Sequence, residues 1–596
     1  MSGSSHATPA SPARRRRRMP RAARVLLGVV ALLLLAWAAA VAVSGAQAAR
    51  ALQRVAGAVP ALEQQVREQR FAEAATTARS VADDAASAHR ATGRWHYRAA
   101  EHLPWAGAQL RAASGGAAAA AVLTEPLPGA LEVVGDALAE GVVSAEQAVD
   151  VAAVQRLVPV VTGYRDRVAV ARAELAAADD PAVLGALSDR LEPVARQLDE
   201  LADPLDTAAE LVPQLPAMLG AEGPRTYLVA FTNPAEVRPV QGIVGAYAYV
   251  SVDGGRISLE RTGTDEDLYR SRADVSVNGD AYEALHGADP DAGRVQNLTV
   301  GAQADDAARL AVSLVADAGL PEPDAVVLVD PVGLAQLLGP HHAPLDLGVF
   351  GEVPTAELPA VLMRDAYVRF ADDNAARKDF LTATSAAAFE AVLADGMSTA
   401  ALRGAQDAVD SGHLALWSAD EQEQAALVAA GLAGVLGEPR AVAHVGLTNV
   451  APSKLDYWTQ PVLRLERPCA AGAQEATAAL ELTLTNPVPE EVPDYVGNLV
   501  ATTSLGERTA RDVVSLWVPP AVGLDSASVD GETVPTAVDS EHGWRLVRLT
   551  VDLPPGEPVV VRWELRGPAG QLPAEVTGPT TVAAPEVTVL PCGAAS

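Results

Sequence analysis

The sequence predicts a multidomain chain with an N-terminal transmembrane helix, an α-helical stalk or bundle, a central α/β domain and a C-terminal antiparallel β-sandwich. Three observations predict this. Val25 to Val43 is a run of nineteen residues without a charge, close to the roughly 20 that cross a bilayer as a helix. Good helix formers dominate residues 45–219. From residue 220 strand-like runs appear, first interleaved with helical patterns and then, from about residue 439, separated by turns.

The N-terminal part of the chain predicts its topology. Residues 1–24 carry seven Arg and no acid, so the positive-inside rule places this basic tail in the cytoplasm, residues 25–44 in the membrane and the bulk outside. Ala46-Gln47-Ala48 fits a cleavage site, and a removed signal peptide is the alternative. We favour the anchor because the apolar run exceeds the usual signal core of about 7–15 residues. No second run reaches spanning length, so a single-pass protein of the cell membrane is expected.

Net charge excludes one class of partner. The 596 residues include 45 Lys and Arg against 75 Asp and Glu, a net charge of −30. So acidic a chain repels nucleic acid, and we expect no nucleic acid as a partner. Only two of the basic residues are lysines, Lys378 and Lys454. The excess of Arg is typical of a GC-rich bacterial genome rather than of a physical requirement.

Periodicity divides the extracytoplasmic part into three segments. Residues 45–219 carry apolar residues at three- and four-residue spacing, as in VLGALSDRLEPVARQLDELADPL, and predict the helical stalk or bundle. Residues 220–438 alternate strands such as TYLVAF, IVGAYAYVSV and DAVVLVD with amphipathic helices such as DDAARLAVSLVADAGL, which predicts an α/β layer structure. Residues 439–596 place AALELTLTN, VVSLWVPP and WRLVRLTVDL between turns, which predicts the sandwich.

Motifs with a known chemistry are scarce. The sequence has no nucleotide-binding loop, no GxSxG elbow, no HExxH and no CxxC pair. Its two cysteines, Cys469 and Cys592, are too few for a disulfide framework or a zinc site. In an oxidising compartment they predict one disulfide, which would tie the C-terminal tail to its domain.

The strongest candidate for a site is a set of charged residues on loops of the central segment. Loops at strand ends are where α/β domains place ligands. Several Arg from separate segments suit a phosphate or pyrophosphate, because the guanidinium fork matches its oxygens. Glu236 or Asp265 beside them suits Mg²⁺. The alternative is a set of ordinary surface ion pairs. The candidate binding residues are Asn233, Glu236, Arg238, Arg261, Arg369, Asp373 and Arg377.

The segment EGPRTYLVAFTNPAEVRPVQGIVGAYAYVSVDGGRISLERTGT resembles the signature of the family labelled domain of unknown function four-zero-one-two. That signature is a strand, Asn-x-x-Glu-x-Arg, a Gly-rich turn and Gly-x-Tyr. The matching positions are Asn233, Glu236, Arg238, Gly242, Gly245 and Tyr247. DAVVLVDPVGLAQLLG and RKDFL also fit, so the resemblance covers about 224–460. It implies a membrane-anchored bacterial protein, as many actinobacteria have, and no particular activity.

The middle segment is more distantly similar to the catalytic domain of the LytR–CpsA–Psr family. Those proteins are single-pass anchored α/β enzymes that move envelope glycopolymers from a polyprenyl-pyrophosphate carrier to peptidoglycan, using Arg residues and Mg²⁺-binding Asp residues. The matching positions are Arg238 in TYLVAFTNPAEVR, Arg261 in ISLERTGT, and Arg369, Asp373 and Arg377 in YVRFADDNAARKDFLTA. The family's metal-binding acids have no counterpart in 241–246 or at Gly263.

These resemblances leave three functions open. The first is a binding or accessory module for envelope glycopolymer assembly or export, whose Arg cluster contacts a lipid-linked glycopolymer. The second is a glycopolymer transferase acting on a polyprenyl-pyrophosphate-linked substrate, with Mg²⁺ held by Glu236 or Asp265. The third is a scaffold that binds other envelope proteins and carries a vestigial site. Whether the chain is an enzyme is left open.

Overall fold

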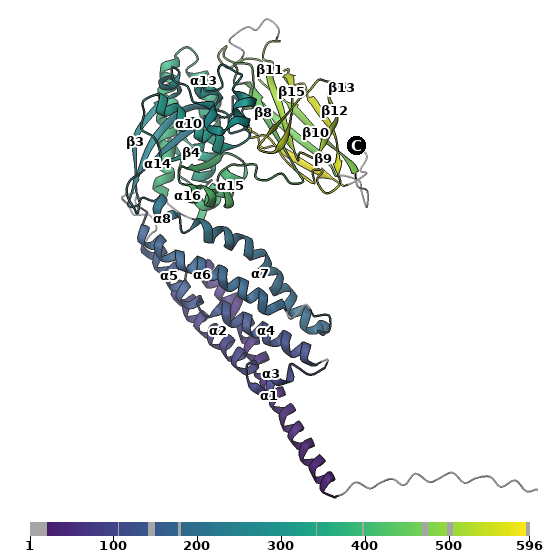
Figure 1. Ribbon diagram of the computed structural model, residues 1–596. Coiled ribbons are helices and arrows are strands. Elements are labelled where there is room, and N and C mark those ends of the chain that lie inside the picture. The colour runs from purple at the N-terminus through teal and green to yellow at the C-terminus, as the bar shows by residue number, and fades with distance from the viewer. Residues whose placement is uncertain are drawn as a thin grey trace, which may run out of the picture. The chain divides into compact units, whose positions relative to one another are not determined.

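The computed structural model describes residues 21–104, 106–140, 149–176, 180–340, 342–395, 399–467, 475–497 and 505–591. The chain divides into two compact units (Figure 1). One is formed by Met1–Ala139 with Val160–Asp206, and the other by Glu140–Pro159 with Thr207–Ser596. In the described residues the first unit is helical, whereas the second contains all the sheets. The central and C-terminal segments therefore belong to one unit, and the boundary between 438 and 439 stays a prediction.

The first helix, α1 (Arg21–Arg67), contains the predicted membrane segment. From Arg24 onward it is long and apolar enough to cross a membrane, with a mean hydropathy of 2.7 in its most apolar window. The helix continues without a break beyond the apolar run and has 47 residues in all, about 70 Å at 1.5 Å per residue. Ala106–Ala137 passes the same test at a hydropathy of 1.3, with 22% of its window buried. A helix of spanning length is thus confirmed, and the single-pass topology stays a prediction.

The helical unit packs mainly through small side chains. Ala48 of α1, Ala88 of α2 and Ala117 of α4 are buried in one cluster. Alanine lets helix backbones approach closely and loses no side-chain entropy on burial. The helices after α1 are α2 (Phe71–Thr92), α3 (Trp95–Ala100), α4 (Ala106–Thr124), α5 (Leu127–Glu140), α6 (Val151–Leu175) and α7 (Gly185–Leu211).

The second unit contains a five-stranded mixed sheet in the order β3-β2-β1-β4-β7. β1 pairs antiparallel with β2 and parallel with β4, so the carboxyl ends of β1 and β4 meet at one edge. β7 runs antiparallel to β4. The strands are β1 (Arg225–Asn233), β2 (Ile243–Asp253), β3 (Arg256–Thr264), β4 (Ala325–Val329) and β7 (Leu414–Ser418).

Helices cover both faces of this sheet, as the α/β prediction requires. Leu228 of β1 lies in a buried cluster with Leu314 of α10, whereas its neighbour Val229 faces the opposite cluster with Ala388 of α14. Successive strand side chains point to opposite faces, so β1 is apolar on both. The helices of this unit are α8 (Leu215–Met218), α9 (Asp280–His286), α10 (Ala304–Asp317), α11 (Pro331–Leu338), α12 (Leu358–Ala360), α13 (Ala366–Arg369), α14 (Asn374–Asp395), α15 (Thr399–Asp410) and α16 (Glu421–Ala429). A two-stranded ladder pairs β5 (Leu345–Asp346) with β6 (Glu352–Val353).

The C-terminal segment forms two further sheets, in the orders β13-β12-β16-β10-β9-β18 and β14-β15-β11-β8-β17. Leu480 of one sheet and Leu516 of the other are fully buried in the same cluster. Most pairs are antiparallel, as predicted, but β17 is parallel to β8 and β18 is parallel to β9. The strands are β8 (Val442–Asn449), β9 (Gln460–Glu466), β10 (Glu475–Thr485), β11 (Ala510–Val518), β12 (Gly523–Val529), β13 (Glu532–Thr533), β14 (Ala537–Glu541), β15 (Trp544–Leu553), β16 (Val559–Pro568), β17 (Glu575–Thr577) and β18 (Glu586–Leu590).

Candidate functional site

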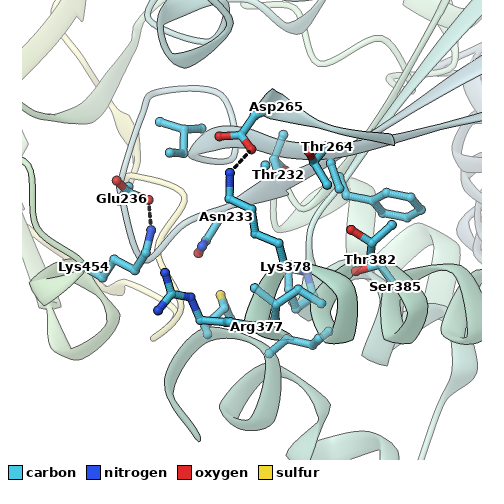
Figure 2. Close-up of a pocket in the computed structure, with 18 of the residues that line it drawn as sticks. Thr232, Asn233, Glu236, Thr264, Asp265, Arg377, Lys378, Thr382, Ser385 and Lys454 are labelled. Atoms are coloured by element: carbon cyan, nitrogen blue, oxygen red, sulfur yellow. Dashed lines mark hydrogen bonds and ion pairs between the residues drawn. The ribbon is translucent and has the colours of Figure 1, made fainter. Parts of the chain in front are cut away.

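A pocket of about 270 Å³ lies at the carboxyl end of β1 (Figure 2). Its walls come from the end of β1 and the loop after it, the start of β2, the end of β3, and α13 and α14. Lys454 and Tyr495 from the C-terminal segment complete it. The pocket therefore occupies the position that open α/β sheets use for ligands, outside the carboxyl end of a strand. Its polar side chains include Thr232, Asn233, Glu236, Asp265, Arg377, Lys378, Thr382, Ser385 and Lys454.

Both lysines of the chain line this pocket. The sequence has 45 basic residues, and Lys378 and Lys454 are its only lysines. They come from α14 and from the loop after β8, and each carries a carboxylate partner. An ammonium group differs from a guanidinium in being a compact charge with three freely rotating donors. The two lysines therefore line the same pocket, which the composition alone did not indicate.

Lys454 is a buried cation. Only 5% of the residue is exposed, and its Nζ forms an ion pair with Oε2 of Glu236. Burial disfavours the charged ammonium, but Glu236 and the phenol of Tyr367 outweigh that effect, and the pKa of Lys454 is raised. Lys454 is therefore a permanent positive charge on the pocket wall and not a free amine.

Lys378 is the second lysine of the pocket. Its Nζ lies 2.9 Å from Oδ1 of Asp265 and 2.7 Å from Oε1 of Glu266. The hydroxyl of Tyr269 donates to the other oxygen of Asp265 at 2.6 Å. Burial lowers the pKa of Lys378, yet the two carboxylates raise it further, so the net shift is upward. Asp265 is thus held by a lysine and a tyrosine at once.

Arg377 supplies a third cation, and it is held by aromatic rings. Its Cζ lies 4.0 Å from the ring centre of Tyr495 and 4.9 Å from that of Tyr367. The two rings stack 5.9 Å apart at an interplanar angle of 9°. One guanidinium nitrogen donates to Oδ1 of Asn374 at 2.5 Å. Only 2% of Arg377 is exposed, so cation–π attraction holds a desolvated guanidinium at the pocket.

Asn233 is fixed by the turn that joins β1 to β2. Its Oδ1 accepts from the amide of Ala235 at 3.0 Å, and its Nδ2 donates to the hydroxyl of Tyr367 at 3.2 Å. Gly242 closes this turn at φ +85°, and a Cβ there would lie 2.1 Å from the carbonyl oxygen of Asn233. Only glycine fits at that position, because both the backbone angle and the space exclude a side chain. The Gly-rich part of the sequence motif is therefore explained by the turn.

Arg238 does not line the pocket, and its guanidinium contacts the backbone beside it instead. Its Nη1 donates to the carbonyl oxygens of Val237 and Asn449 at 2.9 and 3.0 Å. Burial lowers its pKa against the attraction of Glu236, Asp456 and Asp512. These backbone contacts join the loop after β1 to the end of β8. Arg238 does border a neighbouring hollow of about 670 Å³ that shares Glu236, Ile243 and Gln296 with the pocket.

The structure brings together only part of the predicted residue set. Asn233, Glu236 and Arg377 line the pocket, as does the weaker candidate Asp265. Arg261, Arg369 and Asp373 are exposed and are not among its lining residues. Asp373 caps α14, because its Oδ1 accepts from the amide of Ala376 at 3.0 Å.

Lys454, Tyr367 and Tyr495 are pocket residues that the sequence did not point to. The one available signal was the scarcity of lysine, which set Lys378 and Lys454 apart from 43 arginines. Sequence spacing gave no hint that the two would meet. Cys469 and Cys592 lie outside the described residues, so their predicted disulfide stays a prediction.

The charges of the pocket suit a bound anion. Three cations, Arg377, Lys378 and Lys454, face the carboxylates of Glu236 and Asp265. Each carboxylate is already matched by a lysine, so a Mg²⁺ ion on either would have to displace an ammonium group. Arg377 has no carboxylate partner among the described ion pairs, and its charge is left for a ligand. Phe231, Ile243, Leu362 and Met363 add apolar wall.

These observations define a class of protein. A helix of membrane-spanning length comes first in the sequence, and an α/β unit with a cationic pocket at a strand end follows it. Residues 222–367 match the model of the family described as "Protein of unknown function (DUF4012)". The match confirms the first resemblance as far as residue 367, and the part from there to about residue 460 stays a prediction. The matched segment includes Asn233, Glu236 and Asp265, whereas both lysines follow it in the sequence. The similarity to the LytR–CpsA–Psr domain stays a prediction. Comparison with curated proteins finds no match.

Proposed function

We propose that this protein is a membrane-anchored, extracytoplasmic binding module whose pocket holds an anionic ligand with an apolar part. We propose further that the ligand is a phosphate-bearing, lipid-linked sugar used in envelope glycopolymer assembly or export. The observation that carries the proposal is the meeting of Arg377 and both lysines of the chain in one pocket. A guanidinium without a carboxylate partner, beside two ammonium groups, is a setting that attracts phosphate oxygens.

The dimensions of the pocket support a headgroup rather than a whole polymer. About 270 Å³ lies just below the usual range for ligand pockets, roughly 300–1,000 Å³. The adjoining hollow of about 670 Å³ shares three lining residues with it. A ligand that begins with a phosphate in the pocket therefore has a path for further polar groups. In this proposal residues 439–596 form a β-sandwich domain, which supplies Lys454 and Tyr495.

The transferase alternative receives less support from the same geometry. A transferase needs a group that activates the acceptor, or a metal ion that stabilises the leaving pyrophosphate. Glu236 and Asp265 are the pocket carboxylates, and each is bound by a lysine whose pKa is raised. The lysines themselves stay protonated and are not bases. These contacts therefore support binding of a ligand better than they support its chemical conversion.

The test is a binding titration on the full-length protein in detergent with a short-chain polyprenyl-pyrophosphate sugar. We compare the wild type with Lys378→Gln and use Arg369→Ala, an exposed arginine outside the pocket, as the matched control. We expect saturable binding that weakens at least about tenfold in Lys378→Gln, since a charge-assisted contact contributes about 1.5–3 kcal/mol, and no change in Arg369→Ala. A wild type that does not bind at millimolar ligand contradicts the proposal and favours the scaffold alternative. Product formed with a peptidoglycan acceptor would favour the transferase.

A further inference from the structure

A second cluster of titratable side chains lies away from the pocket, between α10 and the turn that joins β14 to β15. Asp306, Glu541 and His542 each offer one donor atom, and these three atoms lie within 4.8 Å of one another. Asp306 is fully buried, and Glu541 is 4% exposed. Two carboxylates and one imidazole in this geometry match the donors that zinc and similar ions take in proteins.

The outer oxygen of each carboxylate is already held by a hydrogen-bond donor. Arg309 donates to Oδ1 of Asp306 at 2.7 Å, and the indole N–H of Trp517 donates to Oε2 of Glu541 at 2.8 Å. The inner oxygens face the imidazoles: Oδ2 of Asp306 lies 2.5 Å from Nε2 of His542, and Oε1 of Glu541 lies 3.2 Å from Nε2 of His286. Oε1 of Glu541 also accepts from the amide of Ala302 at 3.2 Å. Metal-binding carboxylates are oriented by outer partners of this kind.

The backbone holds His542 in an unusual conformation. His542 has φ +48° and Gly543 has φ +79°, the pattern of a two-residue hairpin turn that usually contains Asn-Gly or Asp-Gly. A histidine with positive φ is uncommon and carries a backbone strain of about 1–3 kcal/mol. The turn aims the imidazole at Asp306 on α10, so the strain is used to bring a nitrogen donor to a buried carboxylate.

An unpartnered hydroxyl points to a missing occupant. Tyr282 is 4% exposed, and its hydroxyl has no hydrogen-bond partner among the described residues. Both this hydroxyl and Oε1 of Glu541 border Gly301, since a Cβ there would lie 3.2 and 3.5 Å from them. A buried hydroxyl without a partner costs about 1–3 kcal/mol, which a bound ion or its water would relieve.

The charge balance also favours a cation. Asp305, Asp306 and Glu541 contribute three carboxylates, and Arg309 is the one permanently charged side chain that an ion pair joins to them among the described residues. Buried carboxylates in excess need protons or a metal ion to stay in the interior. A divalent ion bound to these groups would supply the positive charge that they lack.

We propose that Asp306, Glu541 and His542 form a binding site for a divalent ion of the Zn²⁺ class, with His286 and Tyr282 beside it. The site is separate from the pocket above, although His286 also borders the adjoining hollow. It does not depend on the function proposed for that pocket. Three protein donors leave one position for water. The ion would join α10 to the β14–β15 turn, and so the central segment to the C-terminal sheets.

The experiment is a calorimetric titration of the full-length protein in detergent with ZnCl₂ after removal of bound metal by a chelator. We expect one Zn²⁺ per chain, an affinity at least about 100-fold weaker in His542→Ala, and unchanged binding in His89→Ala, which removes an exposed histidine of α2. Absorption of the Co²⁺-loaded wild type gives a readout that needs no variant. The position and intensity of its bands report the ligand type, and their loss on addition of Zn²⁺ shows that both ions bind at the same site. A wild type without saturable binding overturns the proposal, and so does a folded His542→Ala that binds as the wild type does. The cluster would then be an ion-paired contact only.

Discussion

Nζ of Lys378 lies 2.9 Å from Oδ1 of Asp265, although the two residues are 113 positions apart in the sequence. This ion pair joins α14 to the residue that follows β3, and both of its side chains line the pocket (Figure 2). A second carboxylate, Glu266, and the ring of Tyr269 at 5.4 Å complete the surroundings of the ammonium. The cation is therefore positioned before any ligand arrives, which lowers the entropy lost on binding.

The two lysines should differ in their effect on stability. Lys454→Met leaves Glu236 without its partner in a largely buried place, and breaking such a pair costs about 3–5 kcal/mol. Lys378→Met should cost less, because the hydroxyl of Tyr269 still donates to the buried Asp265 and Glu266 is half exposed. The melting temperature of each variant, followed by circular dichroism, checks the difference. The double variant Lys454→Met/Glu236→Gln should recover most of the loss, and a double variant as unstable as Lys454→Met would contradict a role for the pair.

The buried carboxyl of Asp456 should make stability depend on pH. Burial raises its pKa from 3.8 to about 7, against the hydrogen bond from Asn449. The folded chain keeps this proton up to about pH 7 whereas the unfolded chain releases it near pH 3.8, so stability falls as the pH rises between these values. At about 1.4 kcal/mol per unit the loss is on the order of 4 kcal/mol.

Asp456→Asn should remove most of this dependence. The melting temperature of the wild type should drop more between pH 5 and pH 8 than that of the variant, whose amide does not titrate. Asp372→Asn, at an exposed position, is the matched control and should follow the wild type. Parallel pH curves for the wild type and Asp456→Asn would show that the carboxyl is ionised when folded.

Local patterns predicted much of the fold. The predicted strands β1 and β2 contain TYLVAF and IVGAYAYVSV, and the predicted helix α10 contains most of DDAARLAVSLVADAGL. These elements could be predicted because strand and helix periodicities depend on residues that are close in the sequence. The parallel pairing of β17 and β18 at the sheet edges was not predicted. Each of these edge strands pairs with a strand that is distant in the sequence. The residues near β17 and β18 therefore do not indicate which strand they will pair with.

The site was predicted only where its residues share a loop. Asn233 and Glu236 sit on one turn, and the motif pointed to both. Arg238 belongs to the same motif, yet its guanidinium turns inward to the carbonyl of Asn449, 211 positions away. Lys454 reaches Glu236 over 218 positions. Tertiary packing decides which charged side chains lie close together. A prediction that collects every arginine on the loops therefore includes residues that do not line the pocket.

Gly242→Ala should disturb both the fold and the site. The new Cβ would lie 2.1 Å from the carbonyl oxygen of Asn233 at a φ of +85°, and strain at such a position costs about 1–3 kcal/mol. The backbone must move, and Asn233 moves with it. We expect a lower melting temperature and weaker binding of the polyprenyl-pyrophosphate sugar. Gly163→Ala is the control: it lies in α6 with open space around it, so it should leave binding unchanged and raise helix stability by about 0.5–1 kcal/mol. Equal behaviour of the two variants would refute the turn argument.

Tyr495 should contribute to ligand binding through its ring and not through its hydroxyl. It is 38% exposed, and its ring covers the buried guanidinium of Arg377 at 4.0 Å. Tyr495→Ala uncovers Arg377 and removes a cation–π contact of about 1–2 kcal/mol. The affinity for the same sugar should fall by roughly five- to thirtyfold, because 1.4 kcal/mol corresponds to a factor of ten. Tyr495→Phe keeps the ring and should bind within about twofold of the wild type. Calorimetric titration of the three proteins measures both effects. If Tyr495→Phe loses as much affinity as Tyr495→Ala, the hydroxyl and not the ring contributes to binding, which contradicts this prediction.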